Sequence, residues 1–434
     1  MLNVFKIALR NLTRFGRRTL LTSSLITLGI VGVLLFIAVS GSFKSIMIGQ
    51  FTDALLGHLQ VHRRGYVASI DTLPLNLNMR PMMVEKVEQV LKTTEAIEAY
   101  SPRIKIGAMF SNFTETTSIR VNGIDAEKEV TTTPLLPGRM IEGSKEGAVL
   151  KPGEILIPTL LARGMKVKVG DTVVLVATNR DGSVNGKTFA VRGILESASG
   201  PSGKDGYIHL NDARELLRMK EPEVSEIAIR IRNPALLDQV SAQLTQELSG
   251  IGGAGAGKDG QSNAAGMPGK TGKGGGSALE VHTWADLSPF ASIVRMIDLL
   301  AVFIKIMMVS IVLISVMNVM MMAVYERIRE IGTISAIGTP PRRILSLFLT
   351  EGLLLGLGGT ALGTVISLAV IYALNIWKVT FNFGMQQGIV LSPAVSAKDV
   401  ATIATMVVIM ALLASLQPAW KASRMDPVTA LGHV

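Results

Sequence analysis

Four long apolar runs dominate the pattern of hydrophobic and polar positions. They occupy residues 19–40, 293–325, 341–376 and 399–418, and a helix formed by any of them is long enough to cross a bilayer. A signal peptide is the competing interpretation of the first run, because basic residues precede it. That run is longer than the usual apolar region of a signal peptide, and no A-x-A-like site follows it. The pattern therefore predicts four transmembrane helices, the first of them retained.

Residues 1–18 have the pattern of an amphipathic helix. Its apolar side carries Leu2, Phe5, Leu9, Leu12 and Phe15. Its cations are Lys6, Arg10, Arg14, Arg17 and Arg18. We expect this helix to lie in the cytoplasmic membrane interface, where its basic side chains contact anionic lipid head groups.

Residues 41–292 contain no segment that could span a bilayer, and they mix two periodicities. Strand-like runs occur at 59–62, 118–121, 154–157, 172–177, 189–194, 207–210 and 226–231. Helical patterns occur at 82–92, 212–219 and 234–248. Asp181-Gly182 is a hairpin-turn signal between two β-rich runs. The region is therefore predicted to be a folded extracytoplasmic α+β domain.

Residues 249–278 form a low-complexity insert in this domain, composed mostly of Gly, Ala, Ser, Lys and Asn. With so few apolar side chains to bury, we expect the insert to be disordered. A strand-like run follows it at 279–282. The insert is therefore expected to interrupt the domain at a surface loop rather than to separate two domains.

A short charged loop, residues 326–340, separates the second and third apolar runs. Isoleucine recurs every three residues from 328 to 337, which predicts a short helix with an apolar face. Gly338 can end this helix, and Thr339 followed by Pro340 fits an N-cap and first position of the next. The flanking arginines indicate the cytoplasmic side. They are Arg327, Arg329, Arg342 and Arg343.

The third run carries small residues at helical spacing. Gly352, Gly356, Gly359 and Gly363 form two small-xxx-small pairs, which allow neighbouring helices to approach closely. Four spans place both chain termini in the cytoplasm, with residues 377–398 as an outer loop and 419–434 as a cytoplasmic tail. Every basic cluster then lies inside, as the positive-inside rule requires.

The composition agrees with a membrane protein and offers no catalytic site. Of the 434 residues 48% are hydrophobic, and the net charge is +10. The basic residues adjoin the apolar runs, so membrane orientation explains them better than nucleic-acid binding does. The absence of cysteine excludes disulfides, thiolate metal sites and cysteine nucleophiles.

Two glycine-rich stretches and one histidine pair are weak motifs. G-G-A-G-A-G-K-D at 252–259 and P-G-K-T at 268–271 look like phosphate-binding loops, but Asp259 and Ala264 stand where a Ser/Thr and a glycine are needed. His58 and His62 are interpreted as ordinary surface histidines rather than as a metal pair. No H-E-x-x-H or G-x-S-x-G motif is present. We therefore expect a chain that is not an enzyme and binds neither a metal nor a cofactor.

Three stretches together resemble the ABC-transporter permease family that contains MacB, FtsX, LolC and LolE. They are I-A-L-R-N-L-T-R-F-G-R-R-T-L-L-T at 7–22, Y-E-R-I-R-E-I-G-T-I-S-A-I-G at 325–338 and P-A-W-K-A-S-R-M-D-P-V-T-A-L at 418–431. In the outer domain, G-H-L-Q-V-H at 57–62 and V-K-V-G-D-T-V at 167–173 are similar to the LolC/LolE type. In layout the chain looks closest to these lipoprotein-releasing subunits.

The resemblance implies a permease of the bacterial inner membrane that works with a separate cytoplasmic ATPase dimer, which binds ATP and Mg²⁺. It also implies pairing with a second permease, either an identical copy or a paralogue. In this family the loop between the second and third helices is the coupling helix. Carried over to this chain, the contact residues are Glu326, Arg327, Arg329, Glu330, Ile331, Gly332, Ile334, Ile337 and Gly338.

The implied work takes place at the outer face of the membrane. It is release of a lipoprotein or another amphiphile, or periplasmic efflux with an adaptor. The alternative is FtsX-like signalling, in which the outer domain activates a cell-wall hydrolase without transport. A membrane-anchored enzyme is a third possibility, which requires catalytic residues that the sequence does not display.

We predict that deletion of residues 252–276 leaves folding intact, because a disordered loop contributes little packing. The measurement is thermal unfolding of the full-length chain with and without the segment. A large fall in the melting temperature would show that the insert is structured.

Overall fold

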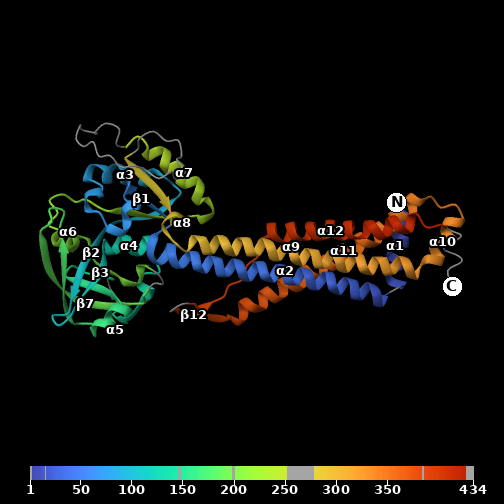
Figure 1. The fold of residues 1–434 in the computed structure, drawn as a ribbon, viewed down its shortest axis with the longest axis horizontal. Helices are drawn as coiled ribbons and strands as arrows, with labels where there is room; N and C mark the ends of the chain where they lie inside the picture. Colours follow the sequence, from blue (N-terminus) through green and yellow to red (C-terminus); the bar gives the residue numbers. More distant parts are fainter. Residues whose placement is uncertain are drawn as a thin grey trace. The chain divides into compact units, whose positions relative to one another are not determined.

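The computed structural model describes residues 2–14, 16–144, 148–197, 201–251, 278–383 and 386–426. The chain divides into two units. The helical unit comprises Met1–Ser45, Ile293–Phe381 and Gly388–Val434, and the sheet unit comprises Ile46–Ser292 and Asn382–Gln387. Figure 1 shows the elements of both units, coloured along the chain from blue at the N-terminus to red at the C-terminus.

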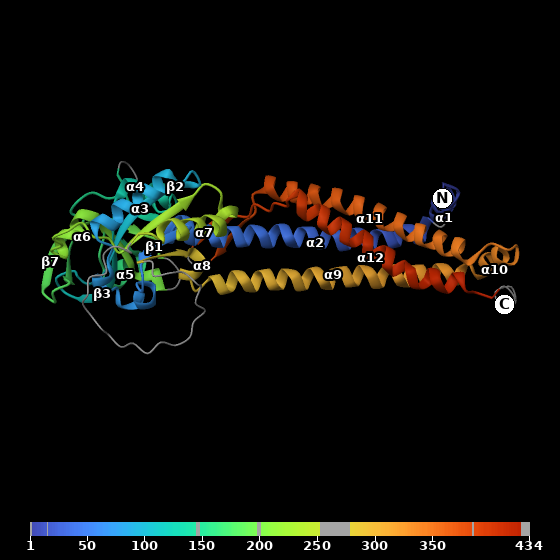
Figure 2. The same ribbon diagram turned by 90° about the horizontal axis from the view of Figure 1, so that it is seen from above.

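Four long helices make up most of the helical unit. They are α2 Gly16–Phe51, α9 Ala291–Glu326, α11 Pro341–Trp377 and α12 Ala397–Ser423, joined by the shorter α1 Leu2–Arg14 and α10 Ile328–Ala336. By length and composition all four long helices can cross a membrane. They run side by side (Figures 1 and 2).

Several helix boundaries differ from those expected. The N-terminal helix ends at Arg14 rather than at residue 18, and Arg17 lies in the first turn of α2. Helix α2 continues to Phe51 instead of stopping at residue 40, because apolar residues such as Met47 still fall at helical positions and no proline interrupts them. Its 36 residues span about 54 Å, well beyond the roughly 30 Å of hydrocarbon in a bilayer.

The C-terminal half of the helical unit also departs from expectation. Helix α12 passes through Pro418 and continues to Ser423, where Ala419 and Ala422 are buried. The expected outer loop 377–398 contains two short paired strands, β11 Thr380–Phe383 and β12 Gln386–Val390.

The glycines of α11 lie where other helices approach. A Cβ at Gly352 would lie 2.5 Å from the side chain of Ser415, and one at Gly356 2.8 Å from that of Ala411, both on α12. A Cβ added at Gly359 would lie 2.7 Å from the side chain of Ile26, and one added at Gly363 would lie 2.9 Å from that of Ile30, both on α2. One helix thus uses its first glycine pair against α12 and its second against α2, at separations that only glycine permits.

A mixed ten-stranded sheet forms the centre of the sheet unit. Its order is β10-β1-β9-β2-β3-β8-β5-β7-β4, and β6 pairs with β2 and β7. The strands are β1 Leu59–Arg63, β2 Ile97–Ser111, β3 Thr116–Ile124, β4 Met140–Gly143, β5 Glu154–Pro158, β6 Thr172–Thr178, β7 Val184–Leu195, β8 Asp205–His209, β9 Glu226–Ile231 and β10 Leu279–Thr283. The accompanying helices are α3 Pro81–Thr93, α4 Ala126–Thr132, α5 Thr159–Met165, α6 Leu210–Leu216, α7 Leu237–Leu248 and α8 Trp284–Leu287.

One face of the sheet packs against helices to form the main hydrophobic core. Leu59 and Val61 of β1 join Val87 of α3, Ala213 of α6 and Leu244 of α7 in this core. The predicted strand runs coincide with β1, β3 and β5 to β9, and Gly182 adopts a positive φ in the β6–β7 turn. Strand β10 pairs with β1, so the segment after the insert completes the same sheet. Most of the insert, 252–277, lies outside the described residues.

The longest strand, β2, has no counterpart among the predicted runs because its middle carries charge. Arg103 is buried, and its Nε donates to Glu129 Oε2 at 3.0 Å while Nη1 lies 3.3 Å from Glu226 Oε1. Lys105 Nζ lies 2.8 Å from Glu226 Oε2. Buried charges persist only when paired, and here the pairs join β2, β9 and α4.

The interpretation of His58 and His62 as surface residues is wrong. Both side chains are buried, and His62 Nε2 lies 3.4 Å from Glu226 Oε2. Burial by itself raises the pKa of Glu226, but Lys105, His62 and Arg103 together hold that pKa well below its usual range.

We predict that Glu226→Gln lowers the free energy of unfolding by about 3–5 kcal/mol, because it leaves Lys105 without its carboxylate and the buried Arg103 with Glu129 alone. Since the folded-state pKa of Glu226 is depressed, its stabilisation is present above the unfolded pKa and is lost as the pH falls through the folded pKa. Denaturant unfolding of the full-length chain in detergent, from neutral to acidic pH, measures both effects.

The matched control is Glu98→Gln. Glu98 pairs with Arg230 at 3.0 Å, but its side chain is 49% exposed, so the expected loss is below about 1 kcal/mol. Equal losses in the two variants would contradict the role assigned to the buried pairs.

Candidate coupling site

The segment between α9 and α11 is a short helix with a break on each side. Arg327 leaves the helical region, with φ −110° and ψ 21°, and separates α9 from α10. After α10, Gly338 has φ +94°, a backbone conformation that favours glycine. Pro340 is the N-cap of α11 and Pro341 is its first residue. The helix therefore begins one residue later than predicted, since Thr339 was expected as the N-cap and Pro340 as the first residue. Proline at 341 explains the shift, because it holds the preceding residue in an extended conformation.

The Arg327 side chain points into the protein. It is 5% exposed, and its Nη1 donates to Glu351 Oε1 of α11 at 3.0 Å. Glu351 is 1% exposed and accepts a second hydrogen bond at the same oxygen, from Asn11 Nδ2 of α1 at 2.7 Å. The Asn11–Glu351–Arg327 cluster therefore joins α1, α11 and the α9–α10 break in a buried setting, where a charge without its partner is costly.

Two outer contacts supplement this cluster. Lys421 Nζ of α12 donates to the hydroxyl of Tyr325 at 2.6 Å and lies 4.8 Å from the centre of its ring. Arg14 of α1 lies 3.9 Å from Glu330 of α10, with both side chains largely exposed. An exposed pair of this kind contributes little stability. The buried cluster is thus the strong connection, and α12 adds a further one beside the break.

The exposed side of α10 is apolar at its C-terminal end. Ile334 is 41% exposed and Ile337 is 81% exposed, with Arg329 and Glu330 exposed one turn earlier. Ile331 and Gly332 are buried. The isoleucines do not form one face, because steps of three residues drift by about 60° per step around a helix of 3.6 residues per turn.

The predicted contact residues therefore fall into two groups. Arg327, Ile331 and Gly332 face the interior and cannot serve as a docking surface, which corrects their assignment. The exposed group is Glu326, Arg329, Glu330, Ile334, Ile337 and Gly338. Neither Asn11 nor Glu351 was among the predicted functional residues. The sequence contained a signal for Glu351, because an ionisable side chain within an apolar run often marks a functional site.

The basic residues of the N-terminal helix lie on its exposed side. Lys6, Arg10 and Arg14 of α1 and Arg17 of α2 are exposed, as are the apolar Phe5 and Leu9 of α1, whereas Ala8 is buried. The side chain of Arg18 lies outside the described residues. Cations beside exposed apolar side chains fit the expected position in a membrane interface.

The described part of the chain contains no group of three or more His, Asp or Glu side chains that could hold a metal ion. The two stretches that look like phosphate-binding loops, at 252–259 and 268–271, lie outside it.

Comparison with known proteins matches two family models to the chain. A model of the MacB-like periplasmic core domain matches residues 19–247, more than half of the chain, and a model of the FtsX-like permease C-terminal region matches residues 302–427. Among solved structures, the periplasmic region of MacB from Actinobacillus actinomycetemcomitans has a TM-score of 0.33 at 9% identity, covering 55% of this chain and 92% of that one. A score of this size adds nothing to the family assignment.

Similar proteins of known name are permeases of the same family. The lipoprotein-releasing system transmembrane protein LolC of Neisseria meningitidis is 23% identical over 96% of this chain and 94% of its own length. The pyoverdine export ATP-binding/permease protein PvdT of Pseudomonas savastanoi is 39% identical, and the macrolide export protein MacB of Nitrosomonas europaea 38%, each over 27% of this chain. These two matches cover only 16% of either relative. The chain belongs to the MacB/FtsX/LolC family of ABC-transporter permeases.

Proposed function

We propose that α10 is the coupling helix of this permease and docks on a separate cytoplasmic ABC ATPase, which binds ATP and Mg²⁺. One observation carries the proposal: α10 is a separate short helix that presents Ile334 and Ile337 to solvent while buried contacts fix its position. Protein–protein interfaces commonly have an apolar centre and a polar rim, and the exposed isoleucines of α10 with their charged neighbours have this arrangement.

The Asn11–Glu351–Arg327 cluster provides the mechanical link in this proposal. A force applied to α10 acts directly on Arg327, which stands at the break between α9 and α10. From there the ion pair leads to α11 and the amide hydrogen bond leads to α1. Because breaking a buried charge pair is costly, the cluster favours movement of these helices together over separation.

ATP-driven closure of two ATPases would then move the long helices of two paired permeases and do work at the outer face. We further propose release of a lipoprotein or another amphiphile from the outer leaflet as that work. The similarity to LolC over 96% of the chain supports this substrate class over periplasmic efflux, since the PvdT and MacB matches cover 27% of the chain. In this arrangement both termini and α10 lie in the cytoplasm and the sheet unit lies outside.

We predict that Ile337→Glu abolishes stimulation of the ATPase while the protein still inserts and folds, because a charge replaces the most exposed apolar side chain of α10. Arg329→Glu should weaken stimulation less, since it changes only the polar rim. The measurement is ATP hydrolysis by the partner ABC ATPase, in nanodiscs with each variant. Ile141→Glu is the control, because Ile141 is an exposed isoleucine of the sheet unit. Wild-type stimulation by Ile337→Glu would remove α10 as the docking site.

We predict that Asn11→Leu uncouples hydrolysis from release with only a small loss of stability, about 1 kcal/mol, because the Arg327–Glu351 pair remains. Glu351→Ala should instead cost about 3–5 kcal/mol, since it leaves Arg327 buried without its carboxylate. Thr13→Ala, an exposed change on the same helix, should alter neither quantity. Thermal unfolding and the ratio of substrate released to ATP hydrolysed are measured together. Normal coupling in Asn11→Leu would show that α1 takes no part in transmission.

A further inference from the structure

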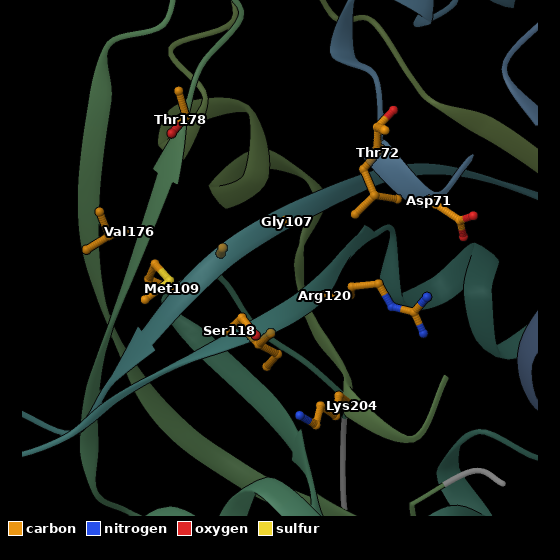
Figure 3. Close-up of a pocket in the computed structure, with 12 residues that line it drawn as sticks. Asp71, Thr72, Gly107, Met109, Ser118, Arg120, Val176, Thr178 and Lys204 are labelled. Carbon is orange, nitrogen blue, oxygen red and sulfur yellow. The ribbon is translucent and has the colours of Figure 1, made fainter. Parts of the chain in front are cut away.

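A groove crosses the sheet face opposite the hydrophobic core. It consists of two adjoining depressions within the sheet unit, of about 240 and 500 Å³, that share Asp71, Leu73 and Arg120. We call it the sheet-face groove. Figure 3 shows its larger depression, in which Asp71, Arg120 and Lys204 lie toward one end and Val176 and Thr178 toward the other.

The floor of the smaller depression is polar and contains an unsatisfied atom. Gln60 of β1 is 1% exposed, and its Nε2 donates to the carbonyl of Leu56 at 2.7 Å. Its Oε1 is buried and finds no donor among the residues that the structure describes. A buried amide oxygen without a partner is costly, so this position favours a ligand that supplies an N–H or O–H group.

Basic side chains lie beside Gln60 along the groove. Lys105 and Asn122 line the smaller depression, Arg120 lies where the two depressions meet, and Lys204 lines the larger one. Arg120 Nε donates to Asp205 Oδ1 at 2.8 Å. The groove is lined by three cations, Lys105, Arg120 and Lys204, and by two carboxylates, Asp71 and Asp205. Lys105 is also paired with Glu226, so three carboxylates balance the three cations and the groove has no overall excess of positive charge. Lys204 and the guanidinium of Arg120 both line the larger depression, and side by side they suit a phosphate, whose oxygens a guanidinium binds well.

Apolar side chains also line the smaller depression, and we call them its apolar wall. Phe51 and Phe290 stack with ring centroids 4.5 Å apart, and Leu55, Ile70 and Leu73 also line this depression. The combined volume of the groove lies in the range of small-molecule sites, which are mostly apolar with a few placed polar groups. An acyl chain fits the apolar wall better than a polar metabolite does.

We propose that the sheet-face groove binds an anionic amphiphile that has an acyl chain, a phosphate and a hydroxyl or amine donor. The chain lies against Phe51, Ile70 and Phe290, the phosphate beside Arg120, and the donor on Gln60 Oε1. This class includes glycerophospholipid head groups attached to one acyl chain. The proposal deepens the proposed release of an amphiphile and rests on it for its biological meaning, whereas binding itself requires neither α10 nor an ATPase and is tested without them.

The test uses the full-length chain in amphipol, with an environment-sensitive fluorophore at a single introduced cysteine. Thr178→Cys is suitable because Thr178 lines the groove and the chain has no cysteine of its own. The probe is lauroyl lysophosphatidylglycerol below its micelle concentration. We expect saturable binding, with glycerol 3-phosphate and lauric acid each weaker by about tenfold or more, since each lacks one of the recognised parts.

Two variants locate the site, and a third is the control. Arg120→Gln, which removes the cation, and Ile70→Trp, which fills the apolar wall, should each weaken binding about tenfold. Arg64→Gln should have no effect, because Arg64 belongs to another arginine–carboxylate pair, 3.6 Å from Glu280, that does not line the groove. Thermal unfolding of all three verifies that they fold.

Three outcomes would overturn the proposal. Binding unchanged in both variants would place the amphiphile elsewhere. Equal affinity for glycerol 3-phosphate would identify a free-phosphate site, and displacement of the probe by an extended peptide without an acyl chain would identify a peptide-binding groove. A photoactivatable acyl chain provides independent mapping, with adducts expected at Leu55, Ile70 or Phe290.

Discussion

The ion pair between Arg327 and Glu351 determines how the helical unit is organised beside α10. Its two charges are almost completely buried, so neither residue can move away from the other without exposing or stranding a charge. This constraint keeps the α9–α10 break against α11, and Asn11 extends the constraint to α1. The orientation of α10, with Ile334 and Ile337 outward, follows from the fixed position of Arg327 and the burial of Ile331.

The sheet unit uses the same physical rule for a different purpose. Arg103, Lys105 and His62 surround Glu226 and make possible a charged, buried layer on the sheet face opposite the core. Side chains alternate between the two faces of a strand, so these positions would ordinarily be exposed to solvent; here the charged layer occupies them. In both units a buried charge network holds elements together that are distant in sequence.

The local patterns of the sequence predicted much of this structure. The apolar runs correspond to α2, α9, α11 and α12, and strand periodicity located β1, β3 and β5 to β9. Gly338 was expected to end a helix and has a positive φ after α10. Boundaries were less well predicted, since the residues after 40 and after Pro418 keep enough apolar periodicity to continue a helix.

Features that depend on distant partners could not be predicted in this way. Arg327 is indistinguishable from a surface arginine until Glu351, 24 positions away, is known to face it. The same holds for His62 and for strand β2, whose charged middle is compatible with a strand only because Glu129 and Glu226 neutralise it. Gln60 on the floor of the sheet-face groove is a third example. The alternation of side chains along β1 predicts that Gln60 faces away from the core, but it does not predict that other residues bury it.

The position of β10 has a consequence for the integrity of the protein. This strand is the end of the sheet and covers β1, yet along the chain it follows the segment 252–277. Cleavage within that segment would leave β10 attached only through its connection to α9. If β10 then dissociated, the backbone of β1 would become an open sheet edge, the kind of surface at which β-proteins aggregate.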